Sequence, residues 1–346
     1  MTPAVKCLIV LAIVALLFIT ELIPLAISAM GGAIACGLLG FIPTKQVFSG
    51  LSNSTVVLFA GMFVVGSAMF HTGLAQKIGT SVVKISGTGE NSLMFGIMIV
   101  GVGLSSVLSN TGTTACLMPV VLGICAAAKI SASRQLMPLA YAASVGGIIT
   151  LVGTPPNIIV SGALSASGYE PFSFFEFAWI GIPLSIVAIL YMIFIGKYLL
   201  PKAELAADQV IEQEIEVTVQ DSKKQIISGL ILAVVVIVMA LDLKSITLEM
   251  AAIIGALVCV LTGCLTEKQA YSSIDWVTIF LFAGMMPVSM AMDKTGAGKL
   301  IAEWAVSMMG GTPNPIVMTA VLFIISCTLV KSCPNSKMKS FKWETI

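Results

Sequence analysis

The polar segment Ser109–Thr114, with the sequence Ser-Asn-Thr-Gly-Thr-Thr, lies inside a run that has no charged side chain. The run extends from residue 91 to residue 128 and is closed by Glu90 and Lys129. Hydroxyl and amide groups are costly in apolar surroundings unless they find a partner. They can donate to an anion, and their oxygens can bind a hard cation such as sodium. The segment therefore predicts a binding site for small ions.

A second polar interruption, Gly153–Asn157 (Gly-Thr-Pro-Pro-Asn), divides another uncharged run, residues 135–169. Two consecutive prolines remove two backbone donors and prevent a continuous helix, so the segment predicts a broken helix. A new helix is expected after Pro156, and a helical arm is expected after Thr111. Each helix N-terminus carries about half a positive charge, so the two could hold an anion without lysine or arginine.

The composition is that of a membrane protein. Hydrophobic residues make up 58% of the 346 residues and charged residues only 10%, with a mean hydropathy of +1.04. Soluble domains carry about 25% charged residues. A net charge of +1 gives no basic surface for nucleic acid, and a single histidine excludes a multi-histidine metal or haem site. We expect no cofactor, and we expect the bilayer as a partner.

The predicted fold is an all-α polytopic membrane protein, an inverted-repeat transporter with re-entrant hairpins and broken helices. The apolar arms on either side of Ser109–Thr114 have about 14 to 17 residues, which reach only about 21–26 Å, short of the ~30 Å hydrocarbon core. We therefore predict a re-entrant hairpin over residues 92–128. Two full spans joined by a turn are the alternative.

The two halves of the sequence align at one constant offset, which we call the repeat offset. It places Lys45-Gln46 on Lys268-Gln269 and Thr72-Gly73 on Thr295-Gly296. An odd number of crossings in each repeat would invert the second copy. The predicted organisation is a first repeat at 1–200, a polar cytoplasmic connector at 201–224, an incomplete second repeat at 225–330 and an aberrant basic tail at 331–346. The first repeat would contain the hairpin 92–128, a broken helix 135–165 and a span 178–200.

The positive-inside rule orients these segments. With the N-terminus outside the cell, the hairpin entering from the cytoplasm and the basic tail 331–346 left out, nine basic residues are cytoplasmic and five are outside. The cytoplasmic set is Lys77, Lys84, Lys129, Arg134, Lys197, Lys202, Lys223, Lys224 and Lys268, and the outer set is Lys6, Lys45, Lys244, Lys294 and Lys299. The expected location is the plasma membrane, or the inner membrane of a cell with two membranes.

On the same register, Ser109-Asn110-Thr111 aligns with Ser332-Cys333-Pro334. The repeat thus predicts a second hairpin tip where the chain turns basic. The expected second arm and second broken helix do not follow. We expect a truncated or frame-shifted reading of a longer gene, with a short natural protein as the alternative.

These motifs resemble those of the divalent anion/sodium symporter family. The similarity rests on Ser109-Asn110-Thr111, on the Gly153–Asn157 break that follows it, and on Ile19–Pro24 near the start. The resemblance implies a transport part that moves like an elevator, a homodimer, and two hairpin tips that each carry Ser-Asn-Thr. The second Ser-Asn-Thr is not present in this chain. By resemblance the substrate-binding residues are Ser109, Asn110, Thr111, Thr154 and Pro155, and the sodium-binding residues are Ser105, Ser109, Asn110 and Gly153.

The expected function is sodium-coupled symport of divalent anions, either sulfate or di- and tricarboxylates. One alternative is a proton-linked exporter of anions or arsenite, or an ion antiporter, of the same superfamily; intramembrane aspartates would favour an antiporter. An intramembrane enzyme would need paired acids or a Ser-His dyad at membrane depth, which the lone His71 does not favour. A truncated chain without function is the last alternative.

Overall fold

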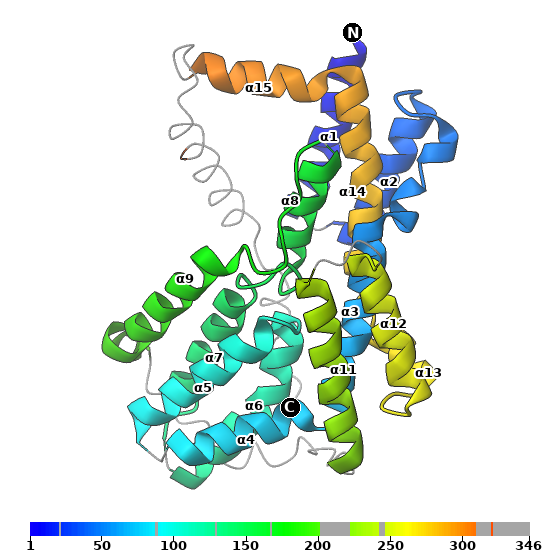
Figure 1. Cartoon of the computed structure of the whole chain (residues 1–346). Coiled ribbons are helices and arrows are strands. Elements are labelled where there is room, and N and C mark those ends of the chain that lie inside the picture. The colour runs from blue at the N-terminus through cyan, green and yellow to red at the C-terminus, as the bar shows by residue number, and fades with distance from the viewer. Residues whose placement is uncertain are drawn as a thin grey trace. The chain divides into compact units, whose positions relative to one another are not determined.

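The computed structural model describes residues 1–20, 22–86, 89–128, 130–166, 168–200, 222–241, 246–308 and 320. All regular structure in these residues is helical (Figure 1). The elements are α1 Pro3–Thr20, α2 Leu25–Leu38, the 3-10 turns η1 Thr44–Gln46 and η2 Ser49–Ser52, α3 Ser54–His71, α4 Leu74–Ser86, α5 Glu90–Ser105, α6 Asn110–Ala128, α7 Ser133–Gly146, α8 Pro155–Ala166, α9 Ala178–Tyr191, the π-helix η3 Met192–Gly196, α10 Lys197–Leu199, α11 Ser222–Ala240, α12 Leu248–Leu261, α13 Glu267–Ser273, α14 Trp276–Thr295 and α15 Ala297–Met308.

Five helical segments of the described residues are long and apolar enough to cross a membrane: Pro3–Thr20, Ser54–His71, Ala178–Leu199, Ser222–Ala240 and Trp276–Thr295. The Ala178–Leu199 segment also has aromatic ends. Trp179 is 84% exposed and Tyr198 is 72% exposed. Along the helix axis the two are separated by about 28 Å, which matches the hydrocarbon thickness of a bilayer. The prediction of an all-α, multi-pass membrane protein is confirmed.

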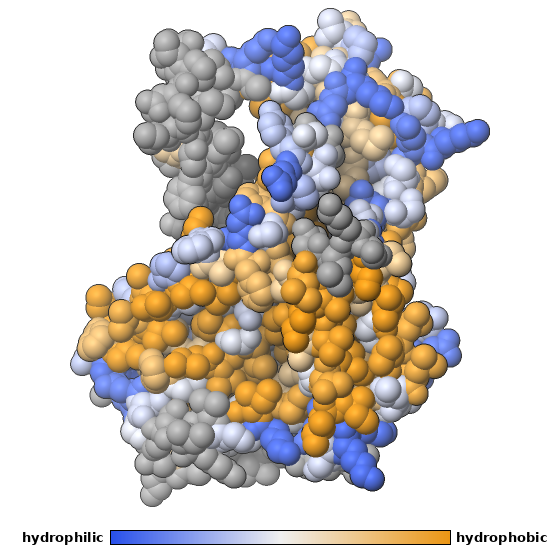
Figure 2. All heavy atoms as spheres, in the orientation of Figure 1, coloured by the Kyte–Doolittle hydropathy of each residue, from blue (hydrophilic) through white to orange (hydrophobic). Residues whose placement is uncertain are grey.

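The chain forms two compact units, and the larger, unit 2, is Val57–Ile274. Its core lies where α5, α6 and α7 pack with α3, α4 and α11, and it includes Leu93, Ile97, Leu117 and Leu139. In Figure 2 apolar side chains cover the visible face of this unit over α5, α7, α9 and α11. An apolar exterior around an apolar core is the arrangement expected for a unit that lies in lipid.

Unit 1 comprises Met1–Val56 and the chain from Asp275 onward. In its described residues α1, α2, α14 and α15 share a core with Cys7, Cys36 and Val288, all fully buried. Asp275 caps α14, because its carboxylate accepts from the backbone N–H of Val277 at 3.1 Å. Fully buried thiols behave here as small apolar side chains.

The repeat offset recurs in the backbone. Helix α2 (25–38) and helix α12 (248–261) have matching bounds at this offset. Four of the five left-handed glycines among the described residues also match at this offset: Gly40 and Gly263 have φ of 74° and 70°, and Gly73 and Gly296 have φ of 76° and 74°. Two of these glycines end α2 and α12, and two link α3 to α4 and α14 to α15. The same turn chemistry therefore shapes both halves of the chain.

The second helix of one half packs against the third helix of the other half, and equivalent positions make the contact each time. In unit 2 a methyl group on Gly61 of α3 would lie 2.7 Å from Cβ of Ala252 in α12. In unit 1 a methyl group on Gly284 of α14 would lie 2.6 Å from the carbonyl carbon of Ala29 in α2. The repeat offset relates the two glycines and also the two alanines, so the same glycine–alanine contact is used twice.

Two helical arms and a break lie where the hairpin and the broken helix were predicted, with shifted bounds, and the re-entrant course of the hairpin stays a prediction. The two arms are α5 (90–105) and α6 (110–128), so Asn110 and Thr111 lie in the first helical turn rather than in the loop. The break in the second run covers residues 147–154, and α8 begins at Pro155. Sequence reasoning placed both prolines inside the break. They start the helix instead, because a first-turn residue needs no N–H donor.

Three predictions lie outside the described residues: most of the connector 201–224, the second hairpin tip near Ser332, and the basic tail 331–346. The domain boundaries drawn from the repeat therefore stay predictions.

Replacing Gly284 by alanine should destabilise the protein, because the new methyl group would overlap the backbone of α2 at Ala29. Overpacking of this kind costs about 1–3 kcal/mol. Gly31→Ala on α2 is the matched control, since nothing lies within 4 Å of the added methyl group. Thermal unfolding in detergent should show a lower melting temperature for Gly284→Ala only. Equal melting temperatures would contradict the close packing of α2 on α14.

Candidate functional site

The N-terminus of α6 is capped by its own polar segment. The Ser109 hydroxyl oxygen accepts a hydrogen bond from the backbone N–H of Gly112 at 3.1 Å. The Ser109 carbonyl accepts from the N–H of Thr113 at 2.9 Å. Serine is among the preferred N-cap residues for this reason. The cap leaves the N–H groups of Asn110 and Thr111 at the free end of the helix, where they form its positive pole.

Ser105, at the end of the first arm, lies at the centre of a cluster of oxygen atoms. Its hydroxyl oxygen is 2.7 Å from Oδ1 of Asn110 and 2.7 Å from the carbonyl oxygen of Ala143 in α7. Ser105 is fully buried. The contact joins three elements, the two arms of the hairpin and the first half of the broken helix. Sequence reasoning identified Ser105 and Asn110 but not Ala143, because a carbonyl ligand has no sequence signal.

Gly147 connects the hairpin tip with the break. A methyl group at this position would lie 2.4 Å from Oδ1 of Asn110 and 2.5 Å from Cγ2 of Thr154. Gly153 approaches the same residue, since its added methyl group would lie 2.4 Å from the Gly147 carbonyl oxygen. Asn110, Gly153 and Thr154, predicted from separate motifs, therefore meet around one glycine that sequence reasoning missed.

Two further polar side chains, those of Asn157 and Thr150, stabilise the break by hydrogen bonds. The Asn157 amide donates to the carbonyls of Gly147 at 3.2 Å and Thr150 at 2.8 Å. The Thr150 hydroxyl in turn donates to the carbonyl of Ser106 in the hairpin. Asn157 is 8% exposed and Thr150 is 1% exposed. These bonds satisfy backbone carbonyls that the broken helix leaves without helical partners, and they fix the break against the tip.

The remaining predicted residues lie at the edge of this cluster. Thr111, in the first turn of α6, is exposed. Pro155 is the first residue of α8 and is partly buried. Ser109 belongs to the cap of α6 and also borders a cavity. The cluster therefore consists of an inner set around Gly147 and an outer, more accessible set at the helix start.

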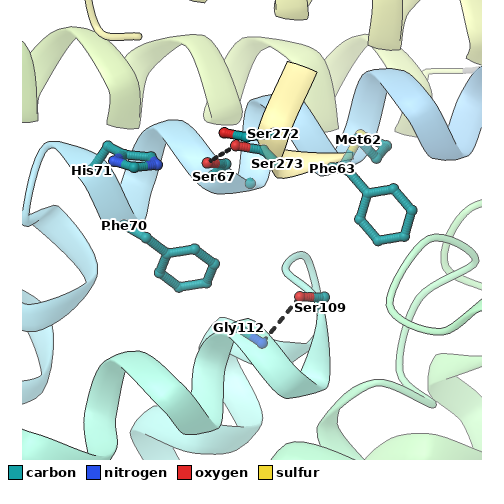
Figure 3. A pocket seen from close by; sticks show the side chains of 10 residues that line it. Met62, Phe63, Ser67, Phe70, His71, Ser109, Gly112, Ser272 and Ser273 are labelled. Carbon is teal, nitrogen blue, oxygen red and sulfur yellow. Dashed lines mark hydrogen bonds between the residues drawn. The ribbon is translucent and has the colours of Figure 1, made fainter. Parts of the chain in front are cut away.

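A cavity of about 300 Å³ opens beside the hairpin tip within unit 2. Ser109 and Gly112 form one wall, and Ser67, Phe70 and His71 of α3 lie across from them (Figure 3). Ser272 and Ser273, at the end of α13, complete the polar part of the lining, and Ser273 is hydrogen-bonded to Ser67. The volume matches the lower end of the range for small-molecule sites.

Backbone groups at helix ends, and not charged side chains, give the tip its partial positive charge. Between Glu90 and Lys129, and between Arg134 and Glu170, the sequence has no charged side chain. Helices α6 and α8 both begin at the cluster, with Asn110 and Pro155 as their first residues. The site thus offers two helix N-termini to an anion and hydroxyl, amide and carbonyl oxygens to a cation.

A sequence profile of the CitMHS family, described as citrate transporter, matches residues 15–335 of the chain. The chain belongs to this transporter family. The match includes the hairpin, the break and both halves of the repeat, and it confirms the assignment to the ion transporter superfamily drawn from the motifs. The chain is therefore a multi-pass membrane protein of a transporter family, and this family membership is consistent with the expectation that it is not an enzyme.

Three similar proteins in other organisms are each named as an uncharacterized transporter. YfbS of Escherichia coli is 38% identical over 183 residues, which cover 53% of this chain and 30% of YfbS. A Haemophilus influenzae transporter is 27% identical over 345 residues, which cover 92% of this chain and 71% of the relative. A Synechocystis transporter, sll0640, is 32% identical over 62% of this chain and 35% of its own length. The chain thus spans about a third of two of these relatives.

Replacing Gly147 by alanine should disrupt the cluster, because the added methyl group would overlap the Asn110 and Thr154 side chains. We expect a cost of about 1–3 kcal/mol and faster hydrogen exchange in residues 105–114. Gly103→Ala on α5 is the control, since its methyl group would meet nothing within 4 Å. Exchange measured by mass spectrometry compares the two variants. Unchanged exchange in Gly147→Ala would show that the tip and the break do not meet.

Proposed function

We propose that this transporter carries small divalent anions, either di- and tricarboxylates or sulfate, by symport with sodium. One observation carries the proposal: the oxygen cluster of Ser105, Asn110 and Ala143 lies beside two helix N-termini in an uncharged region. The family description, citrate transporter, supports the carboxylate class.

The anion would be held at the positive ends of α6 and α8. The N–H groups of Asn110 and Thr111, the Ser109 hydroxyl and the Thr154 hydroxyl are donors at this point. The Ser109 oxygen already accepts from Gly112, so its own proton is free to be donated outward. Donors of this kind suit any small oxyanion, and the exposed Thr111 and the partly buried Ser109, which borders the cavity, would meet it first. Pro155 would contribute the start of α8.

The cation would be held by the inner oxygens. A single hydroxyl proton on Ser105 serves only one of its two oxygen neighbours at 2.7 Å, Asn110 Oδ1 or Ala143 O. Either the Asn110 amide turns so that its nitrogen donates to Ser105, or a cation lies among the three oxygens. We propose the second arrangement, with Ser109 and the Gly153 carbonyl as further ligands.

Coupling follows from the closeness of the two charges. Asn110 belongs to both sets, since its backbone N–H faces the anion and its side-chain oxygen faces the cation. Opposite unit charges about 5 Å apart attract by about 3 kcal/mol at an effective dielectric constant near 20. Each ion would therefore raise the affinity for the other, which is what symport requires.

The proposed transport cycle is the one that the resemblance to the divalent anion/sodium symporter family implies. We propose that the hairpin and the broken helix move as an elevator in a homodimer. We further propose that the N-terminus lies outside the cell and that the hairpin enters from the cytoplasmic side of the plasma or inner membrane. Lys77 and Lys197, both assigned to the cytoplasm, support this orientation: they donate to Gln225 at the start of α11 and to Asn91 at the start of α5.

A panel of anions tests the function directly. Succinate, citrate and sulfate are added to the purified transporter with and without sodium, and thermal unfolding is recorded. We expect at least one anion to raise the melting temperature more in sodium than in an equal concentration of choline. Stabilisation by anions that is indifferent to sodium but rises with acidity would replace sodium coupling with proton coupling.

Replacing Asn110 by alanine should abolish both effects, because it removes the side-chain oxygen that would hold the cation and, with the cation, the coupling that favours the anion. Hydrogen bonds and ligands to charged groups contribute about 1.5–3 kcal/mol, so sodium affinity should fall about 10- to 100-fold. Thr114→Val, which removes a hydroxyl bonded only to the Asn110 carbonyl, is the matched control in the same helix. Sodium-dependent stabilisation that survives in Asn110→Ala would refute the double role.

A further inference from the structure

A partly buried ion pair lies at the end of the hairpin remote from the tip. Nη1 of Arg134 is 3.1 Å from Oε1 of Glu90, and the two side chains are 13% and 36% exposed. The described residues contain one other ion pair, Lys299–Glu303, at 3.8 Å with side chains 80% and 62% exposed. Exposed pairs contribute little to stability, whereas a partly buried pair is screened less. Glu90–Arg134 is therefore the stronger constraint.

The position of Arg134 is unfavourable without its partner. Arg134 is the second residue of α7, where the helix N-terminus is already positive, and the preceding Ala132 provides no side-chain cap. Helix α5 begins beside it with Glu90 as its first residue, so two positive helix ends and a guanidinium meet at one place. The negative carboxylate of Glu90 offsets the positive charge of both helix ends and of the guanidinium. Its backbone carbonyl also accepts from the Gln135 amide at 3.3 Å.

From this end α5 and α7 stay in contact as far as the site. A methyl group on Gly101 would lie 3.0 Å from Cβ of Ala142, and one on Gly146 would lie 2.5 Å from the Val102 carbonyl oxygen. The next contact is the Ser105 hydroxyl on the Ala143 carbonyl. Figure 1 shows α5 and α7 side by side. Because the two helices are in close contact along this length, a shift of α5 along α7 at the Glu90–Arg134 end would also displace Ser105 at the tip.

We propose that Glu90 and Arg134 form a latch that sets the register of α5 on α7 and thereby positions the oxygen cluster about 22 Å away along α5. Both are positioning residues, since neither touches the cluster. The inference rests on the proposed function only for its sodium readout. Releasing the latch should loosen the tip and weaken sodium binding.

The test uses Glu90→Gln and Arg134→Gln in the intact transporter, with the reversed pair Glu90→Arg/Arg134→Glu as the rescue. Two quantities are measured: the sodium concentration that gives half-maximal thermal stabilisation, and hydrogen exchange of residues 105–112 without ligand. We expect each single variant to raise the half-maximal sodium concentration about fivefold or more and to speed exchange at the tip. The reversed pair should return both quantities to within about twofold of the original protein.

Lys299→Gln, which removes the exposed ion pair on α15, is the control and should change neither quantity. Arg134→Lys keeps the charge and serves if a neutral variant does not fold; it should give a smaller shift in the same direction. Single variants that melt at a lower temperature yet keep both quantities unchanged would overturn the latch, as would a folded reversed pair that restores neither. If sodium does not stabilise the original protein, the proposed function is wrong. The hydrogen exchange of residues 105–112 in the variants then tests the latch by itself.

Discussion

The packing of the broken helix against the hairpin tip depends on hydrogen bonds that pair buried polar groups with one another. The Thr113 hydroxyl is an exception, because it is buried without a hydrogen-bond partner among the described residues. The break between α7 and α8 releases carbonyls that no helix can satisfy, and Asn157 and Thr150 bind them or bridge from them to the hairpin. The cost of leaving such groups unpaired is several kcal/mol each in hydrocarbon. The tip and the break therefore stabilise each other, and neither would persist alone in an apolar environment.

Charge is segregated along the same helices. Glu90 and Arg134 stand at the start of α5 and α7, and only neutral groups follow as far as the tip. At the anion site proposed above, a fixed lysine would bind strongly in every state of a transport cycle. Backbone N–H groups would bind more weakly and would place no charged side chain in the membrane. The proposed uncharged site therefore suits a carrier, which has to release what it binds.

Local sequence patterns predicted much of this arrangement. The uncharged runs, the proline pair and the repeated Thr-Gly steps predicted the hairpin, the broken helix and the two halves, because each depends on neighbouring residues. The meeting of Asn110 with Thr154 around Gly147 depends on tertiary packing, and glycine at a close approach carries no signal beyond its presence. The prediction placed the start of α8 after Pro156, whereas the helix begins at Pro155. The proline pair was interpreted as a helix breaker, but proline is also favoured at the first position of a helix.

The exchange of partners between the two halves has a consequence for biosynthesis. Ala29 packs on Gly284, which is translated much later, whereas Ala252 packs on Gly61, which is already made. At about 5–20 residues per second, α2 would wait on the order of 10–50 s for its partner helix. During that interval its small-residue face lies open to lipid or to other newly inserted helices. The contact between α2 and α14 therefore forms only after the residues of the hairpin tip and the break have been made.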